Sequence, residues 1–143
     1  MKLRELMTDD VKVCRPDDSV MDAAKAMQSV NVGIIPVCEG DKLTGVITDR
    51  DIVLNVVALG KDVNTTRVRD CMTSSVVTGT PDMDAHEAAD LMADHQIRRL
   101  PVVEGGRLVG IVSIGDLATV SIHEDEAGYA LSEISEPSQP QAH

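Results

Sequence analysis

The sequence has almost no aromatic residues: it contains no Trp, no Phe and a single Tyr. A core built from these 143 residues must therefore be aliphatic, filled by Val, Ile, Leu, Ala and the seven Met. Proteins that bind nucleic acids need basic surfaces, and those that bind single strands add stacking aromatics. With 13 basic against 24 acidic residues and a net charge of −11, the chain has neither feature. The composition argues against nucleic acid as a partner.

Motifs for catalysis or metal binding are also missing. Cys14, Cys38 and Cys71 form no CxxC pair and are odd in number, which favours buried thiols in a reducing cytoplasm over disulfides or a zinc site. The four histidines lack metal-ligand spacing, and the chain has no P-loop, GxGxxG or HExxH. Without a nucleophile or acid–base constellation, we expect a protein that is not an enzyme, with no metal site and no required cofactor.

Long apolar runs are absent as well. No stretch approaches the roughly 20 residues of a membrane-spanning helix, and the first ten residues lack the apolar segment of a signal peptide. We therefore expect a cytoplasmic protein without a membrane partner. A chain of this length forms one domain or two very small ones.

The most prominent feature of the sequence is an internal repeat. Residues 3–53 align with residues 68–118 without a gap, at an offset of 65, and 16 of these 51 pairs are identical. Both copies contain the same ending, "GVITDRDI" at 45–52 and "GIVSIGDL" at 110–117. The predicted boundaries are a first copy at 1–59, a connector at 60–67 and a second copy at 68–121. An acidic tail at 122–143 is expected to be disordered, or to form at most a short helix near 129–134.

Each copy has the pattern of a β-α-β-β-α unit. The runs at 11–14 and 75–78 are β-prone, and helical spacing of apolar residues follows Ser19 and Asp84, which are suitable N-caps. Hairpins are predicted over 34–48 and 99–113, and closing helices over 51–59 and 116–122. The fold class is therefore α/β (α+β), with two units packed about a pseudo-twofold axis.

The repeated hydroxyl-x-x-Asp pattern has two interpretations. Thr48-x-x-Asp51 and Ser113-x-x-Asp116 fit a capping box, in which the hydroxyl and the carboxylate accept backbone N–H groups at a helix start. The same groups also suit a ribose phosphate, because an acidic side chain can accept both ribose hydroxyls. Finding Asp in both copies, where a cap tolerates many residues, favours the ribose-phosphate interpretation.

Together, the tandem units, the "IIPV" and "RLPV" strands and the G-h-h-[ST]-x-x-D endings resemble a pair of cystathionine β-synthase (CBS) domains, a Bateman module. The resemblance covers residues 1 to about 121, as in small stand-alone prokaryotic CBS-pair proteins. It implies regulatory binding of AMP, ADP, ATP, NAD or S-adenosylmethionine in clefts between the two units. It also implies a homodimer and a role in signal transduction or energy sensing through a separate, unknown regulated protein.

The resemblance also implies the site residues. Asp51 and Asp116 would hold ribose hydroxyls, and Thr48 and Ser113 would approach the phosphate or the sugar. The base pocket would be lined by residues before the two strand prolines and by the opening runs: Gly33, Ile34, Ile35 and Leu100, with Val11, Val13, Val76 and Thr78.

Three arginines are candidates for binding phosphate. Arg98 and Arg99 are the first choice, although they could instead be solvated charges near Asp94 and Glu104. Arg50 could reach a phosphate or pair with Asp49. Because the first copy has Gly-Ile-Ile where the second has Arg-Arg-Leu, we expect both sites to be competent but unequal, with the site around Arg98 the stronger.

Two other functions stay open. The clefts could be vestigial in a structural scaffold that dimerises through apolar helix faces, namely Ile52, Val53, Val56 and Val57 in one helix and Leu117 and Val120 in the other. Alternatively, the same cleft could sense Mg²⁺ or a cyclic dinucleotide.

Overall fold

The computed structural model describes residues 1–119, which form two compact units. The first-repeat unit contains Lys12–Val76 and Gly106–Leu108, and the second-repeat unit contains Met1–Val11, Val77–Gly105 and residues 109–119. The expected acidic tail and its short helix lie outside the described residues. Among residues 1–119, no helix has the length and apolar character needed to cross a membrane.

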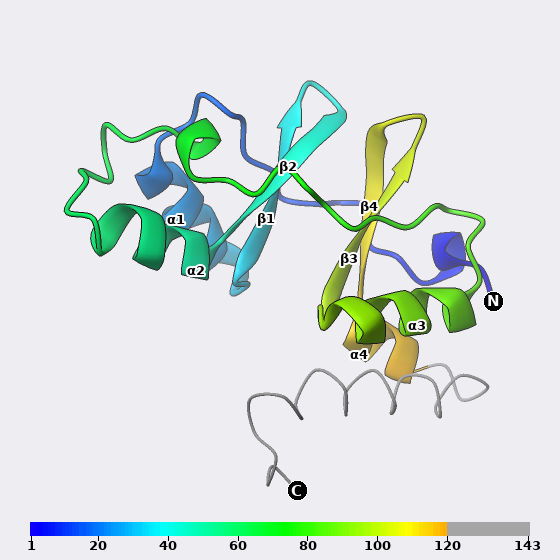
Figure 1. The fold of residues 1–143 in the computed structure, drawn as a ribbon. Helices are drawn as coiled ribbons and strands as arrows, with labels where there is room; N and C mark the ends of the chain where they lie inside the picture. The colour runs from blue at the N-terminus through cyan, green and yellow to red at the C-terminus, as the bar shows by residue number, and fades with distance from the viewer. Residues whose placement is uncertain (120–143) are drawn as a thin grey trace, which may run out of the picture. The chain divides into compact units, whose positions relative to one another are not determined.

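The first-repeat unit packs two helices beside a β-hairpin (Figure 1). Helix α1 (Val20–Val30) begins at Ser19, whose hydroxyl accepts the N–H of Asp22. Strands β1 (Ile34–Glu39) and β2 (Lys42–Thr48) pair antiparallel, with a bulge after Val37. Helix α2 (Asp49–Ile52) continues as one π-helical stretch, Val53–Val57, and a 3₁₀ turn covers Val68–Asp70. The predicted helix and hairpin are confirmed.

The second-repeat unit has the same helix–strand–strand–helix order, but its 3₁₀ turn comes before the first helix. A 3₁₀ turn (Leu3–Glu5) precedes helix α3 (Ala85–His95), strands β3 (Arg99–Glu104) and β4 (Arg107–Ser113), and helix α4 (Ile114–Ala118). Asp84 caps α3 by accepting the N–H of His86. Each hairpin turns through glycine at positive φ, +62° at Gly40 and +59° at Gly105, as a tight turn between twisted strands requires.

The cores are aliphatic, as the lack of aromatics predicts. Small and branched side chains from the helices interlock with those of the strands: Val20, Ala23, Met27, Ile35, Val37, Ile47 and Val56 in the first-repeat unit, and Ala85, Ala88, Ala89, Met92, Leu100, Val112 and Leu117 in the second-repeat unit. The matched methionines Met27 and Met92 are core residues, in agreement with the repeat.

Each compact unit contains the opening segment of the other repeat in place of its own. Leu3 donates its N–H to the carbonyl of Met83, and Val68 donates to the carbonyl of Asp18, an equivalent bond at the 65-residue offset. The side chains of Leu3 and Val68 are both fully buried. Each unit is therefore completed by the segment that opens the other repeat.

The predicted strands at 11–14 and 75–78 are wrong in extent. The run at 11–14 makes a single parallel bridge, at Cys14 with Val37, and the run at 75–78 makes none, because the equivalent bridge lies just after it, at Gly79 with Val102. Cys14 donates to the carbonyl of Pro36 and accepts from Cys38. The next bonds on either side would need an N–H from Pro36 or Pro16, and proline has none. Pro81 and Pro101 limit the Gly79 bridge in the same way.

Candidate functional site

Both hydroxyl-x-x-Asp motifs lie where a strand runs directly into a helix. At the first junction, Thr48 Oγ1 accepts the N–H of Asp51 (3.0 Å), and Asp51 Oδ2 accepts the N–H of Thr48 (3.0 Å). At the second, Ser113 and Asp116 form the same reciprocal pair, at 3.1 and 2.8 Å. The structure therefore contains both predicted capping boxes. They engage Oδ2 of each half-buried carboxylate and leave Oδ1 outside the box.

The start of the preceding strand lies at the same junction in each unit. Asp49 donates its N–H to the carbonyl of Gly33 (2.9 Å), and Ile34 pairs with Thr48 in the hairpin. The equivalent bond joins Ile114 to the carbonyl of Arg98 (2.9 Å). The structure therefore brings Gly33 and Ile34 to the junction that carries Thr48, Arg50 and Asp51. It brings Arg98 and Arg99 to the junction that carries Ser113 and Asp116.

The other predicted pocket residues lie in the two cores or in the opening runs. The side chains of Ile35 and Leu100 are 1% and 0% exposed and pack in the two cores, so only their backbone can face a ligand in this structure. The two opening runs are each divided by a unit boundary. Val11 and Thr78 fall in the second-repeat unit, and Val13 and Val76 fall in the first-repeat unit. Val11 and Thr78 therefore belong to the unit that carries Ser113 and Asp116, and Val13 and Val76 belong to the unit that carries Thr48 and Asp51.

The arginines at the junctions form no ion pairs within the described part of the chain. Arg98 is exposed and Arg99 is half-buried, and neither pairs with Asp94 or Glu104. Arg50 is exposed, and only its backbone N–H donates to Asp49 Oδ1 (2.8 Å). These guanidinium groups are available to bind an anion, because no carboxylate among residues 1–119 neutralises them.

The two junctions have opposite charge at one equivalent place. A Cβ atom on Gly33 would lie 3.0 Å from Asp49 Oδ2, so the carboxylate of Asp49 covers that position. In the second-repeat unit the equivalent residues are Arg98 and Ile114, so the carboxylate is lost and a guanidinium is gained. The two junctions therefore differ in charge at this place, and the inequality of the two sites stays a prediction.

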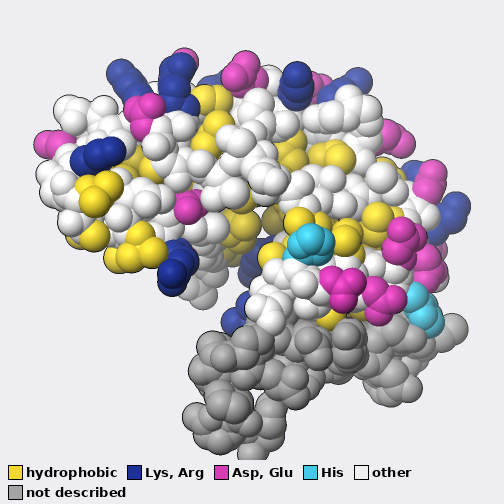
Figure 2. Space-filling model, in the orientation of Figure 1, with side chains coloured by type: hydrophobic (Ala, Val, Ile, Leu, Met, Phe, Trp, Pro, Cys, Tyr) yellow, Lys and Arg dark blue, Asp and Glu magenta, His cyan; other side chains and the backbone are white. Residues whose placement is uncertain are grey.

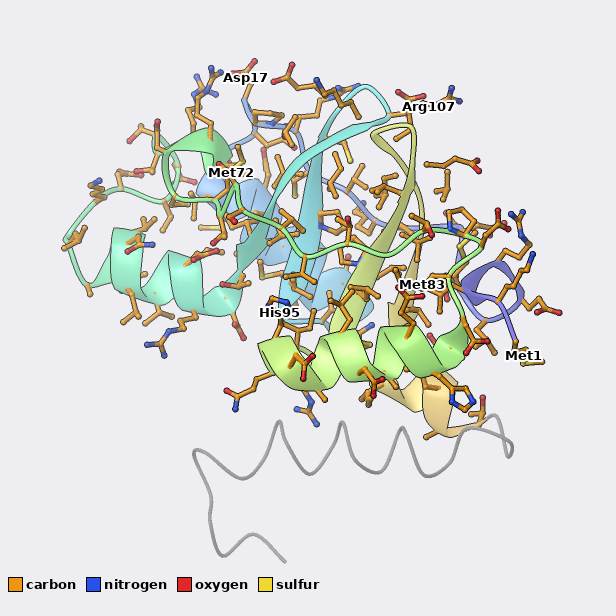
Figure 3. The ribbon with its side chains drawn as sticks, turned by 45° about the vertical axis from the view of Figure 1, so that its right-hand side comes forward. Met1, Asp17, Met72, Met83, His95 and Arg107 are labelled. Carbon is orange, nitrogen blue, oxygen red and sulfur yellow. The ribbon has the colours of Figure 1, made fainter. Side chains whose placement is uncertain are left out.

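Sequence reasoning missed the contribution of the exchanged opening segments. Thr73 Oγ1 lies 3.4 and 3.5 Å from the two carboxylate oxygens of Asp51. Its neighbour Met72 lies against Gly45 of β2, and the segment can be followed past that strand in Figure 3. The Met-Thr pairs at 7–8 and 72–73 recur in both copies, and this repetition was the available signal.

The three cysteines lie inside the first-repeat unit, away from solvent. Burial raises the pKa of Cys14 to about 11, and it also raises the pKa values of Cys38 and Cys71. All three thiols are free and buried. Within residues 1–119, no group of three or more His, Cys, Asp or Glu side chains gathers as a metal site would.

Two surface grooves of the first-repeat unit lie away from its junction. One, of about 390 Å³, is lined by residues of α1 and of the chain before it: Lys12, Val13, Cys14, Asp18, Asp22 and Lys25. The other, of about 430 Å³, lies near the hairpin turn between Arg15, Glu39 and Arg69. Both have mixed charge, and neither includes Thr48 or Asp51.

The CBS domain family matches residues 3–58 and 68–123. The chain belongs to this family. The CBS domain-containing protein YhcV of Bacillus subtilis is 44% identical over 133 residues, covering 93% of this chain and 94% of that protein. YlbB, also of Bacillus subtilis, is 43% identical over 137 residues, covering 94% and 92%. This CBS pair is therefore similar to proteins of nearly the same length.

Solved structures agree with this assignment. The Hypoxic Response Protein I, crystallised with two coordinated zinc ions and known from Mycobacterium tuberculosis, superposes with a TM-score of 0.76 at 32% identity, covering 83% of the CBS pair and 98% of that chain. A Burkholderia ambifaria protein with CBS domains, for which signal transduction is the suggested role, gives a TM-score of 0.70 at 36% identity, covering 82% and 85%. The CBS-CP12 protein of cyanobacteria, another relative, is hexameric.

Proposed function

We propose that this CBS pair is a non-catalytic regulatory sensor whose strand–helix junctions bind an adenosine-containing nucleotide. The observation that carries the proposal is the repeated junction itself. Each holds an aspartate whose Oδ2 is engaged by the capping box while Oδ1 lies outside it. A carboxylate held in this way can accept the hydroxyl groups of a ribose, since an ionised carboxylate has about four acceptor sites.

The arginines support a phosphate on the ligand. Arg98 and Arg99 lie at the junction of Ser113 and Asp116 and have no ion-pair partner within residues 1–119. A guanidinium binds phosphate through paired, charge-assisted hydrogen bonds. The second-repeat junction is therefore the stronger candidate for AMP, ADP, ATP or NAD, and the first-repeat junction tolerates S-adenosylmethionine, which carries no phosphate.

A sensor of this kind acts by population shift. A ligand changes the balance between two arrangements of the protein only by the difference in its affinity for them. The output would be read by a separate protein, and the homodimer that the family resemblance implies would provide the surface that changes.

The test is calorimetric titration of the chain with AMP, ATP, NAD and S-adenosylmethionine. The wild type is compared with an Asp51→Ala/Asp116→Ala variant and with Asp51→Asn/Asp116→Asn, which keeps an acceptor for each cap. Asp22→Ala/Asp90→Ala, on the exposed faces of α1 and α3, is the control for lost charge. Micromolar binding that only the junction variants lose supports the proposal. No binding by a folded wild type contradicts it.

An apolar surface favours a second candidate, a dimerisation scaffold. Val53, Leu54, Val57 and Leu59 are 53%, 44%, 58% and 62% exposed, and Figure 2 shows hydrophobic side chains gathered in the region of α2 and the segment after it. This exposed surface coincides only in part with the predicted dimerisation faces. Ile52, Val56 and Leu117 are buried in the cores, and Val120 lies outside the described residues. Sedimentation of Leu54→Glu/Val57→Glu tests this candidate. A dimeric wild type, a monomeric variant and no nucleotide binding would favour the scaffold.

A Mg²⁺ or cyclic-dinucleotide sensor is the remaining alternative, and no observation favours it. Adding MgCl₂ and cyclic di-AMP to the same titration series distinguishes it from the nucleotide sensor.

A further inference from the structure

The carboxylate of Asp51 contacts two segments that are far apart in sequence. Oδ2 accepts the N–H of Thr48 at 3.0 Å, within its own repeat. The hydroxyl of Thr73, from the segment that opens the other repeat, lies 3.4 Å from Oδ2 and 3.5 Å from Oδ1. Hydrogen bonds between oxygen atoms are normally 2.5–3.0 Å long, so the Thr73 contact is weak and readily replaced.

The backbone of Thr73, in contrast, is held firmly against β2. Thr73 donates its N–H to the carbonyl of Val46 (2.8 Å) and accepts the N–H of Val46 (2.9 Å). Its carbonyl oxygen also fills the space in which a side chain on Gly45 would begin. Upstream, the buried side chains of Val68 and Cys71 anchor the same segment in the core. The segment is thus docked up to Thr73.

Beyond Thr73 this docking ends. Ser74 and Ser75 are exposed, and the chain leaves the first-repeat unit between Val76 and Val77. Thr73 is therefore the last residue of the segment with a backbone bridge to β2 before the unit boundary, and it is also the residue whose hydroxyl contacts Asp51. The second-repeat unit repeats the arrangement: Thr8 bridges Ile111, and the boundary follows Val11.

We infer that ligand binding at Asp51 is transmitted, through competition with the Thr73 hydroxyl, to the segment 68–76, one of the places where the chain passes between the units. This inference rests on the proposed function. Ribose hydroxyls that donate to Oδ1 and Oδ2 replace the weak Thr73 contact, and the segment loses one of the interactions that hold it on β2. By linkage, weaker docking of the segment must strengthen binding of the ligand by the same factor. Thr73 thus acts through Asp51 and does not touch the ligand.

The test combines Thr73→Val, which keeps the shape of the side chain without its hydroxyl, with Thr73→Ser, which keeps the hydroxyl. Amide hydrogen exchange is measured over residues 68–77 with and without AMP, ATP, NAD and S-adenosylmethionine. In the wild type and in Thr73→Ser, the bound nucleotide should accelerate exchange in this segment by roughly two- to fivefold, as expected for loss of one weak hydrogen bond.

Thr73→Val should exchange at the accelerated rate without ligand, should show no further change with it, and should bind nucleotide tighter by the same factor. Thr8→Val is the matched control, since it alters the equivalent hydroxyl of the other unit and should leave exchange at 68–77 unchanged. If nucleotide still accelerates exchange in Thr73→Val as in the wild type, or if this variant binds as weakly as Asp51→Ala, the inference is wrong. The proposed function would still stand. If the wild type binds none of the nucleotides, the proposed function fails and the inference fails with it.

Discussion

The carbonyl oxygen of Thr73 lies 2.7 Å from the position that a Cβ atom on Gly45 would occupy. Real Cβ atoms essentially never approach another atom so closely, so this glycine is required for packing. Gly110 has the same role, because its Cβ would lie 2.6 Å from Met7 Sδ and 3.0 Å from the carbonyl oxygen of Thr8. The glycine that opens each G-h-h-[ST]-x-x-D motif therefore admits the opening segment of the other repeat.

Gly45→Ala should destabilise the protein. The added methyl group collides with backbone, which cannot rotate away, and overpacking of this kind costs about 1–3 kcal/mol. Gly115→Ala is the matched control: it lies in α4, its nearest neighbour would be Ser113 Oγ at 3.6 Å, and alanine favours a helix. Urea unfolding measures both. Equal midpoints for Gly45→Ala and the wild type would contradict the packing role.

Arg98→Ala/Arg99→Ala should weaken ATP binding at the second-repeat junction by about 10- to 100-fold, the effect of losing charge-assisted hydrogen bonds. Binding of S-adenosylmethionine, which has no phosphate, should change far less. Arg107→Ala, which removes an exposed arginine paired with Asp41 at 3.0 Å, is the control. Calorimetry with both ligands separates the two sites. Equal affinities of the two sites, with binding unaltered in the double variant, would rule out the predicted inequality.

Cys14 should be almost inert towards alkylation in the folded protein. Because burial raises its pKa to about 11, its thiolate fraction at pH 8 should be roughly a hundredfold below that of a free cysteine. Mass spectrometry after iodoacetamide treatment measures this at pH 8 and again in guanidinium chloride, where all three cysteines should react. Rapid modification of Cys14 without denaturant would show that the opening run is not held at β1.

The exposed ion pair of Arg4 with Asp82 should add a small, acid-sensitive contribution to the stability of the second-repeat unit. The hydrogen bond from Arg4, followed by its charge, lowers the pKa of Asp82 below 3.8. A carboxylate with a lowered pKa stabilises the fold above its ordinary pKa, and the contribution is lost as the pH falls through the folded-state value. Arg4→Ala should therefore lower the urea midpoint at pH 7 and have little effect near pH 2. If Arg4→Ala lowers the urea midpoint by the same amount at pH 7 and pH 2, the effect comes from lost packing and not from the ion pair.

Much of the fold could be predicted from the repeat and from the residues that cap its helices and form its turns. Ser19 and Asp84 predicted the starts of α1 and α3, and Gly40 and Gly105 predicted the hairpin turns, because caps and tight turns depend on neighbouring residues. The single bridges in place of strands could also have been predicted, since Pro16 and Pro36 lack the N–H groups that a longer ladder requires.

The candidate site, too, could be predicted only in part. The family, the hydroxyl-x-x-Asp motifs and the difference in charge between the two copies could be predicted from the sequence, because they follow from residue identity at a fixed offset. That residues 1–11 and 68–76 complete the opposite repeat's unit, and that Thr73 contacts Asp51, became visible only in the folded chain. Local sequence could not predict this exchange, because a buried Leu3 or Val68 fits an apolar core in either copy. The choice between them depends on long-range backbone hydrogen bonds and close packing, which no local pattern records.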